Sequence, residues 1–211
     1  NQFVSNLGIM TKSHPTLPCE PTNLTLPHQN TKGQESEHVL IPSDNTVSTF
    51  WITNPDNVYR DNVAAGSDQV GFWMAFPTHP TGQFEGTEVS KNTWPGRTKL
   101  REFSGNTAHS NFDGLMLDRG PRPDGKFGIA GPNLISYAYP ADTSSGVVAS
   151  VFENFTGYKN RNGAVWGRGE MHLYRGLKLA DNAIGFTHAS GIPGIAPYTS
   201  RVVDSLFVGE S

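Results

Sequence analysis

The chain has 211 residues, of which 17% are charged, and its formal net charge is −3 at pH 7. The 16 lysines and arginines are scattered, which argues against a nucleic-acid-binding surface. No apolar run approaches the roughly 20 residues that a membrane span needs. With 23 glycines, 15 prolines and no sustained helical period, the composition favours an all-β protein with one sizeable core.

Residues 13–43 form the first distinct segment, in which prolines recur among polar residues. We predict an irregular excursion that lies over the rest of the fold. It contains Cys19, the only cysteine, which cannot form a disulfide within this chain. Sequons at Asn23 and Asn154 permit N-glycosylation in a secretory compartment.

A short phrase recurs along the middle and end of the chain: an Asn, two further residues, and a Gly that opens an apolar run. Its copies are Asn111 to Gly114, Asn160 to Gly163 and Asn182 to Gly185, with a looser copy within 51–74. The last two glycines are 22 residues apart (185 − 163), which suits one coil of a parallel β-solenoid. The first two are 49 apart (163 − 114), which predicts two coils and an insertion.

The residue types in the phrase have a physical reason. Asn tolerates the left-handed conformation at a corner, and Gly adopts it without a Cβ clash. Asn side chains in stacked coils can also pair in a ladder, in which each satisfies the next. The alternative is that the same residues mark hairpin turns in an antiparallel sandwich.

The insertion is predicted at 119–145, where prolines and glycines exclude any long regular element. Loops of this length are usually functional or disordered. The chain ends in an apolar strand near Val208. Because bare solenoid ends would expose strand edges, we expect 1–211 to be a single segment of a longer chain, with flanking domains on the same parent chain.

Polar groups that could carry chemistry follow the repeated Gly residues. Asp118 and Arg119 occupy the fourth and fifth positions after the first Gly, and Arg168 the fifth after the second. Stacking about 4.8 Å apart would bring them onto neighbouring rungs, with Glu170 and His188 close by. Two carboxylates can act as acid and base or nucleophile on a glycosidic bond, and an Arg or His can hold a uronate carboxylate.

Each candidate also has a structural interpretation. Asp118 with an arginine is equally well explained as a solvated ion pair worth under ~1 kcal/mol. His109 precedes a corner, where an imidazole often caps backbone groups, although it could also contact substrate. Trp73 and Trp166 suit coil stacking better than a sugar platform.

A known family is resembled by the sequence of residues 48–57, which is followed by Ala64-Ala65-Gly66-Ser67 and Gly71-Phe72-Trp73. The likeness is to the cell-migration-inducing hyaluronan-binding proteins and transmembrane cell-surface hyaluronidases, and more distantly to fibrocystin. It continues through Ala108-His109-Ser110-Asn111, Ala180-Asp181-Asn182 and the closing 205–211, and so covers nearly the whole chain.

The resemblance implies a right-handed parallel β-helix with long loop insertions in an extracellular or cell-surface protein. Its implied partner is a polysaccharide, hyaluronan or similar, which is bound or depolymerised. It also implies calcium, for which Asp113 and Asp142, with Asp118, are the candidate oxygen ligands. On the enzyme hypothesis, Asp118, Glu170 and Arg168 act in catalysis. The substrate-binding residues would then be Arg119, His188, His109 and Trp166.

This chain departs from its relatives at 163–170. Relatives read Gly-Ala-Trp, an apolar residue, then Arg-Gly-Gly-Asp, whereas here the Trp and Arg are displaced by one position and Asp becomes Glu. We expect either a bulge or an Arg168 that points elsewhere. A His-rich stretch of the relatives is replaced by 137–142. A glycan-acting enzyme, a non-catalytic carbohydrate-binding ectodomain and a structural solenoid spacer therefore all remain as hypotheses.

Overall fold

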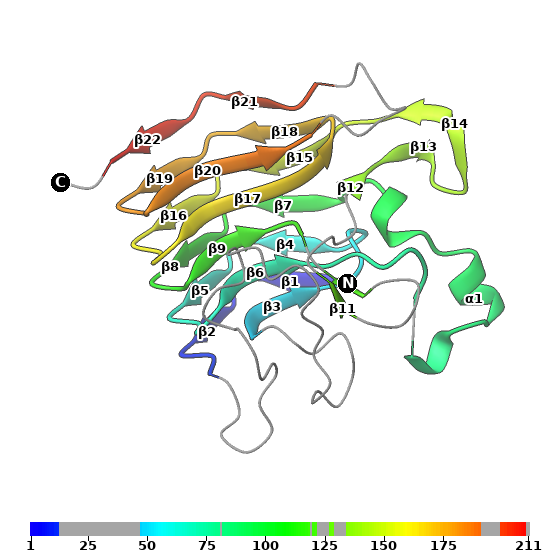
Figure 1. Cartoon of the computed structure of the whole chain (residues 1–211), viewed down its shortest axis with the longest axis horizontal. Helices are drawn as coiled ribbons and strands as arrows, with labels where there is room; N and C mark the ends of the chain where they lie inside the picture. Colours follow the sequence, from blue (N-terminus) through cyan, green and yellow to red (C-terminus); the bar gives the residue numbers. More distant parts are fainter. Residues whose placement is uncertain are drawn as a thin grey trace.

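A computed structural model describes residues 1–12, 47–80, 82–118, 120–121, 127–128, 134–190 and 199–209. Within these ranges the chain winds into stacked coils, with strands from successive coils side by side (Figure 1). The predicted excursion 13–43, Cys19, Asn23 and Arg119 lie outside the described residues.

Three sheets run along the stack, each receiving one strand from successive coils. The first contains β1 (Gln2–Val4), β4 (Val58–Arg60), β7 (Glu102–Ser104), β15 (Ser150–Glu153), β18 (His172–Arg175) and β21 (Arg201–Val203). The second contains β2 (Leu7–Ile9), β5 (Val63–Ala65), β8 (Thr107–His109), β16 (Thr156–Tyr158), β19 (Lys178–Ala180) and β22 (Leu206–Val208).

The third sheet is the one that carries the candidate site. Its strands are β3 (Ser48–Ile52), β6 (Val70–Met74), β9 (Asp113–Met116) and β17 (Gly163–Glu170), with β12 (Leu134–Ile135) and β20 (Ile184–Ala189) both pairing with β17. Neighbouring strands in all three sheets are parallel. The predicted parallel β-helix is therefore confirmed, and the antiparallel sandwich is wrong.

Among the described residues, two excursions leave the coils. Residues between β6 and β7 form η1 (Gly82–Phe84), α1 (Glu88–Lys91) and η2 (Pro95–Arg97), a short helical segment that the sequence did not predict. The predicted insertion 119–145 contains two antiparallel pairs. These are β10 (Gly120–Pro121) with β11 (Phe127–Gly128), and β13 (Tyr137–Tyr139) with β14 (Asp142–Val147). Figure 1 shows α1 and the β13–β14 hairpin projecting on the same side of the coils.

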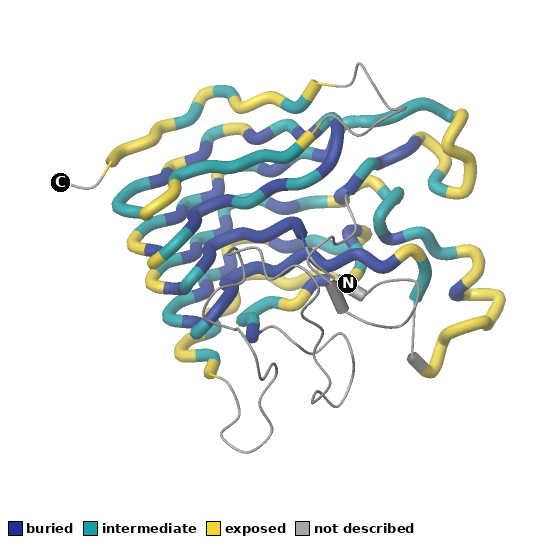
Figure 2. Tube along the Cα trace, in the orientation of Figure 1, coloured by how far each residue is buried: buried dark blue, intermediate teal, exposed yellow. Residues whose placement is uncertain are grey.

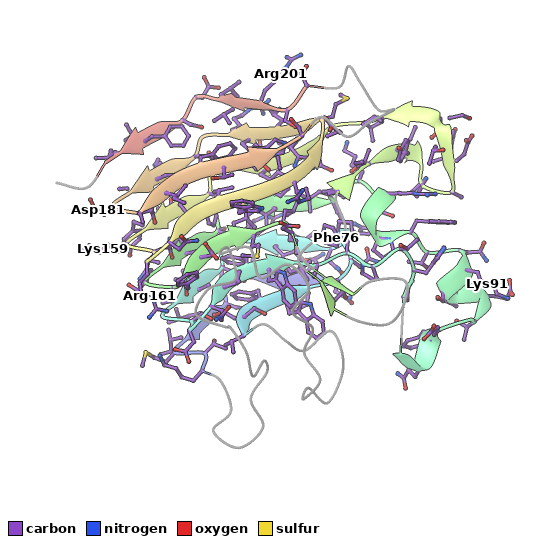
Figure 3. The ribbon with its side chains drawn as sticks, viewed as in Figure 1. Phe76, Lys91, Lys159, Arg161, Asp181 and Arg201 are labelled. Carbon is purple, nitrogen blue, oxygen red and sulfur yellow. The ribbon has the colours of Figure 1, made fainter. Side chains whose placement is uncertain are left out.

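The corners are built from left-handed residues stacked in two columns. One column joins the first sheet to the second and consists of Ser5, Asp61, Gly105, Asn154, Gly176 and Asp204. The other follows the second sheet and consists of Met10, Gly66, Ser110, Lys159 and Asp181. Their φ angles of 51–73° turn the chain within very few residues. Figure 3 shows Lys159 and Asp181 together at these turns, on the side of the coils opposite Lys91 of α1.

Asparagines pair between coils as the sequence predicted. The backbone N and Nδ2 of Asn111 both donate to Asn160 Oδ1, at 3.2 and 3.1 Å. The same two groups of Asn160 donate to Asn182 Oδ1, each at 3.0 Å. A second ladder links Asn6, Asn62 and Asn106. These side chains satisfy buried backbone groups at corners where no strand ladder is available.

The core fills the interior of the coils (Figure 2). In the third sheet, one inward row is formed by Phe50, Phe72, Leu115, Val165 and Phe186, which are matched by strand register. Phe72 also meets the ring of Phe103 edge-on, with centroids 5.4 Å apart. In the part of the chain that the structure describes, no helix is long and apolar enough to cross a membrane.

Candidate functional site

The outer face of the third sheet presents two rows of side chains. The register places Trp51, Trp73, Met116, Trp166 and Thr187 in one row. Side chains two positions further along a strand share its face, so Asp118, Arg168 and Ala189 lie in the neighbouring row. Trp51 stacks on Trp73 with ring centroids 5.7 Å apart, while Trp73 itself is fully buried. Stacking of this kind agrees with the structural role expected for Trp73.

A β-bulge at the start of β17 decides which side chains of this strand face outward. The ladder matches Asn111 with Asn160, 49 residues on, whereas Leu115 pairs with Val165, 50 residues on. One residue is therefore extra. The Oδ1 atom of Asp113 accepts hydrogen bonds from Gly163 N at 3.0 Å and from the neighbouring Asn162 Nδ2 at 2.9 Å. Of the two expected alternatives, the structure shows the bulge, after which Trp166 and Arg168 both face outward.

Asp118 is the centre of the site. Its carboxylate accepts two hydrogen bonds from Arg168, Nε to Oδ1 at 2.9 Å and Nη2 to Oδ2 at 3.1 Å. Trp166 Nε1 donates to Oδ2 at 3.1 Å, and Trp73 Nε1 donates to the backbone oxygen of Asp118 at 2.9 Å. A guanidinium and two indoles thus fix one residue. The role of Trp73 could not be read from the sequence, because its donor reaches a backbone atom 45 residues away.

The exposure of the ion pair is uneven. The side chain of Asp118 is 5% exposed, whereas that of Arg168 is 34% exposed. Arginine has five N–H donors, and Asp118 takes two of them. The donors that remain lie on the outer part of the guanidinium and can bind a second planar anion. Asp118 is an acceptor in every one of these bonds, so it suits holding Arg168 better than donating a proton.

A buried polar chain lies on the inner side of the same strand, beneath Gly167. His172 Nε2 is 2.8 Å from the carbonyl oxygen of Leu134, which can only accept, so Nε2 carries the proton. Burial lowers the pKa of His172 to about 3, so the ring is neutral and its Nδ1 accepts from the Tyr174 hydroxyl at 3.1 Å. The Tyr174 oxygen in turn accepts from His188 Nδ1 at 3.2 Å. His188 therefore faces the interior rather than the outer surface.

Because His172 is neutral in the folded protein, the free energy of unfolding is expected to depend on pH. The pKa of His172 is about 3 in the folded protein, whereas an exposed histidine in the unfolded chain has its ordinary pKa of 6.5, so the unfolded state binds more protons as the pH falls below 6.5. His172 should therefore contribute a loss of unfolding free energy of about 1.4 kcal/mol per pH unit below that value. Urea unfolding at pH 7.5 and 5.5 measures it. The His172→Gln variant should show a weaker pH dependence; an equal slope in both proteins would contradict the assignment.

The remaining predicted site residues lie elsewhere. Glu170 is 3% exposed and its charge opposes the lowering of the His188 pKa, which is caused mainly by burial. His109 lies on β8 in the second sheet, where its ring stacks on Tyr158 with centroids 4.7 Å apart. The structure therefore brings Asp118, Arg168 and Trp166 together.

The two candidate calcium ligands do not form a shared site. Asp113 is buried at the bulge, while Asp142 is exposed on the β13–β14 hairpin. Asp142 Oδ1 accepts from both the N and the Oγ of Ser144, which lowers its pKa. Among the described residues, no group of three or more His, Cys, Asp or Glu side chains could hold a metal ion. Within the part of the chain that the structure describes, Asp113 and Asp142 therefore do not form a calcium site together.

Comparison with known proteins places the chain in a family. Residues 1–116 match the family described as CEMIP beta-helix. A protein of Dictyostelium discoideum is 34% identical over 232 residues, which span all of this chain and 20% of that protein. Human cell surface hyaluronidase CEMIP2 is 32% identical over 224 residues, and mouse cell migration-inducing and hyaluronan-binding protein is 33% identical over 227. Each of these two matches spans all of this chain.

These relatives are much longer than the chain, which spans 16% of the human and mouse proteins and 20% of the Dictyostelium one. The matched segments cover the positions of Asp118 and Arg168 in this chain. Together with the parallel coils, the match over residues 1–116 shows that this chain belongs to the CEMIP β-helix family.

Proposed function

We propose that the outer face around Asp118, Arg168 and Trp166 binds an acidic polysaccharide, hyaluronan or a similar uronate-bearing chain, outside the cell or at its surface. The observation that carries the proposal is the bidentate Arg168–Asp118 pair, in which the arginine side chain remains 34% exposed. The names of the human and mouse relatives, a cell surface hyaluronidase and a hyaluronan-binding protein, support the choice of ligand.

The pair is suited to this task because Asp118 pre-orients the arginine. A guanidinium held at two N–H groups loses less side-chain freedom when a ligand carboxylate binds its other donors. Trp166 lies beside it with its indole N–H fixed on the same carboxylate. Planar, bidentate recognition of a carboxylate is a task that arginine performs better than lysine.

Binding to matched polymers tests the proposal. We expect the longest soluble form of the protein to bind hyaluronan, and to bind at least about tenfold more weakly to hyaluronan whose carboxyl groups have been reduced to alcohols, since tenfold equals about 1.4 kcal/mol. The Arg168→Lys variant should bind hyaluronan more weakly by a similar factor, as measured by biolayer interferometry. Arg175→Lys is the control, because Arg175 pairs with Glu153 on the first sheet. Equal binding of both polymers would contradict the proposed carboxylate recognition.

Depolymerisation is a separate question, which the same protein can answer. Labelled high-molecular-weight hyaluronan would be incubated with calcium or with chelator and then sized by gel filtration. A fall in polymer size that Asp118→Asn abolishes would support an enzyme. An unchanged profile with intact binding would support a carbohydrate-binding ectodomain, and a protein that neither binds nor depolymerises hyaluronan would favour a structural spacer.

A further inference from the structure

On the outer face of the third sheet, the side chains of β20 are smaller than those of the neighbouring strand β17. On β17 the outward side chains are Trp166 and Arg168, and their register partners on β20 are Thr187 and Ala189. A large side chain is thus followed by a small one in both rows. Thr187 and Ala189 are both half-buried. We call these two small residues of β20, which neighbour the candidate site, the ledge.

The geometry of Arg168 turns its remaining donors toward this ledge. In the third sheet β9 pairs with one edge of β17, while β20 and β12 pair with the other. Asp118, two residues beyond β9, therefore lies on one side of Arg168, and Ala189 lies on the other. Nε and one N–H of Nη2 point at Asp118. Because a guanidinium is planar, Nη1 and the second N–H of Nη2 point away from that carboxylate. On that side the register partner of Arg168 is Ala189, one rung or about 4.8 Å further along the stack.

We propose that the polysaccharide lies over β20, with a uronate carboxylate above Ala189 against the outer donors of Arg168. Thr187 Oγ1 then lies in the neighbouring row, where it can bond a sugar hydroxyl. Thr187 and Ala189 are specificity-determining residues, because a larger or acidic side chain at either position would occupy the space of the ligand. This inference rests on the proposed function and adds the direction of the chain and the residues that admit it.

Substitutions at Ala189 test the ledge. Ala189→Glu places a carboxylate where the ligand carboxylate would bind, and Ala189→Gln has the same size without the charge. Ala180→Glu controls for general repulsion of a polyanion, because Ala180 is also half-buried and lies on β19 of the second sheet. We expect Ala189→Glu to weaken hyaluronan binding at least about tenfold, or about 1.4 kcal/mol. Ala180→Glu should stay within about threefold of the unchanged protein, and Ala189→Gln, which fills part of the same space without the charge, should fall between the two.

The outcomes separate the two proposals. If the unchanged protein does not bind hyaluronan, the proposed function fails. If it binds, and Ala189→Glu binds equally well, the ledge is wrong while the proposed function stands. Equal losses in Ala189→Glu and Ala180→Glu would also overturn the ledge, because they would show general repulsion alone. Thermal unfolding of each variant checks folding. Should Ala189→Glu unfold, Ala189→Trp blocks the same space without charge and is expected to cause the same tenfold loss.

Discussion

Replacing Asn160 with alanine is expected to lower the free energy of unfolding by about 3–5 kcal/mol. The Oδ1 atom of Asn160 accepts from the backbone N and Nδ2 of Asn111, and its Nδ2 donates to the carbonyl of Ala108 and to Asn182. Asn160 is 2% exposed, so water cannot replace these bonds. Each buried group left without a partner costs about 1–3 kcal/mol.

The matched control is Asn92→Ala. Asn92 is exposed at the end of α1, and its Nδ2 donates only to the carbonyl of Glu88. Water can satisfy that carbonyl after the substitution, so the loss should stay within about 1 kcal/mol. Urea unfolding followed by circular dichroism compares the two variants. Similar losses in both would mean that the ladder contributes no more than an exposed cap.

Replacing Gly167 with alanine is expected to cost about 2–5 kcal/mol of unfolding free energy. A Cβ at this position would collide with the Tyr174 hydroxyl and would lie 2.6 Å from His188 Nδ1. Both groups belong to the buried chain that runs from Leu134 through His172. Relieving the collision requires the hydroxyl to move, which breaks bonds that no water can replace. Because Gly167 precedes Arg168, hyaluronan binding should weaken as well.

Gly185→Ala provides the comparison for Gly167→Ala. Gly185 lies on β20 in the same sheet, and a Cβ there would meet only Phe207, at an ordinary contact distance of 3.7 Å. Its unfolding free energy should change by less than about 1 kcal/mol. Thermal and urea unfolding of both variants compare their unfolding free energies. A Gly167→Ala protein as stable as Gly185→Ala would show that the Tyr174–His188 contact is not tightly packed.

The secondary structure of the two excursions could not be predicted from sequence patterns. Residues 75–101 carry no long periodic run, and α1 has four residues, too few to give a helical repeat. Its N-cap, Thr87, whose Oγ1 accepts from Ser90 N at 3.2 Å, is a short local signal that many loops share. The insertion 119–145 was located by its prolines and glycines. Its antiparallel hairpins depend on pairings that composition does not encode.

The sequence by itself determined the parallel coils, their asparagine ladder and the family, because each depends on residue types that recur at a fixed spacing. Only the tertiary structure decided which side chains share a surface. Successive residues of a strand face opposite ways, so the single extra residue before β17, held by Asp113, decides that Arg168 faces outward toward Asp118. The same alternation directs His188 inward to Tyr174. Spacing counted from the repeated glycines misses such a bulge, because the glycines are not register partners: Gly163 pairs with Ile184 rather than with Gly185.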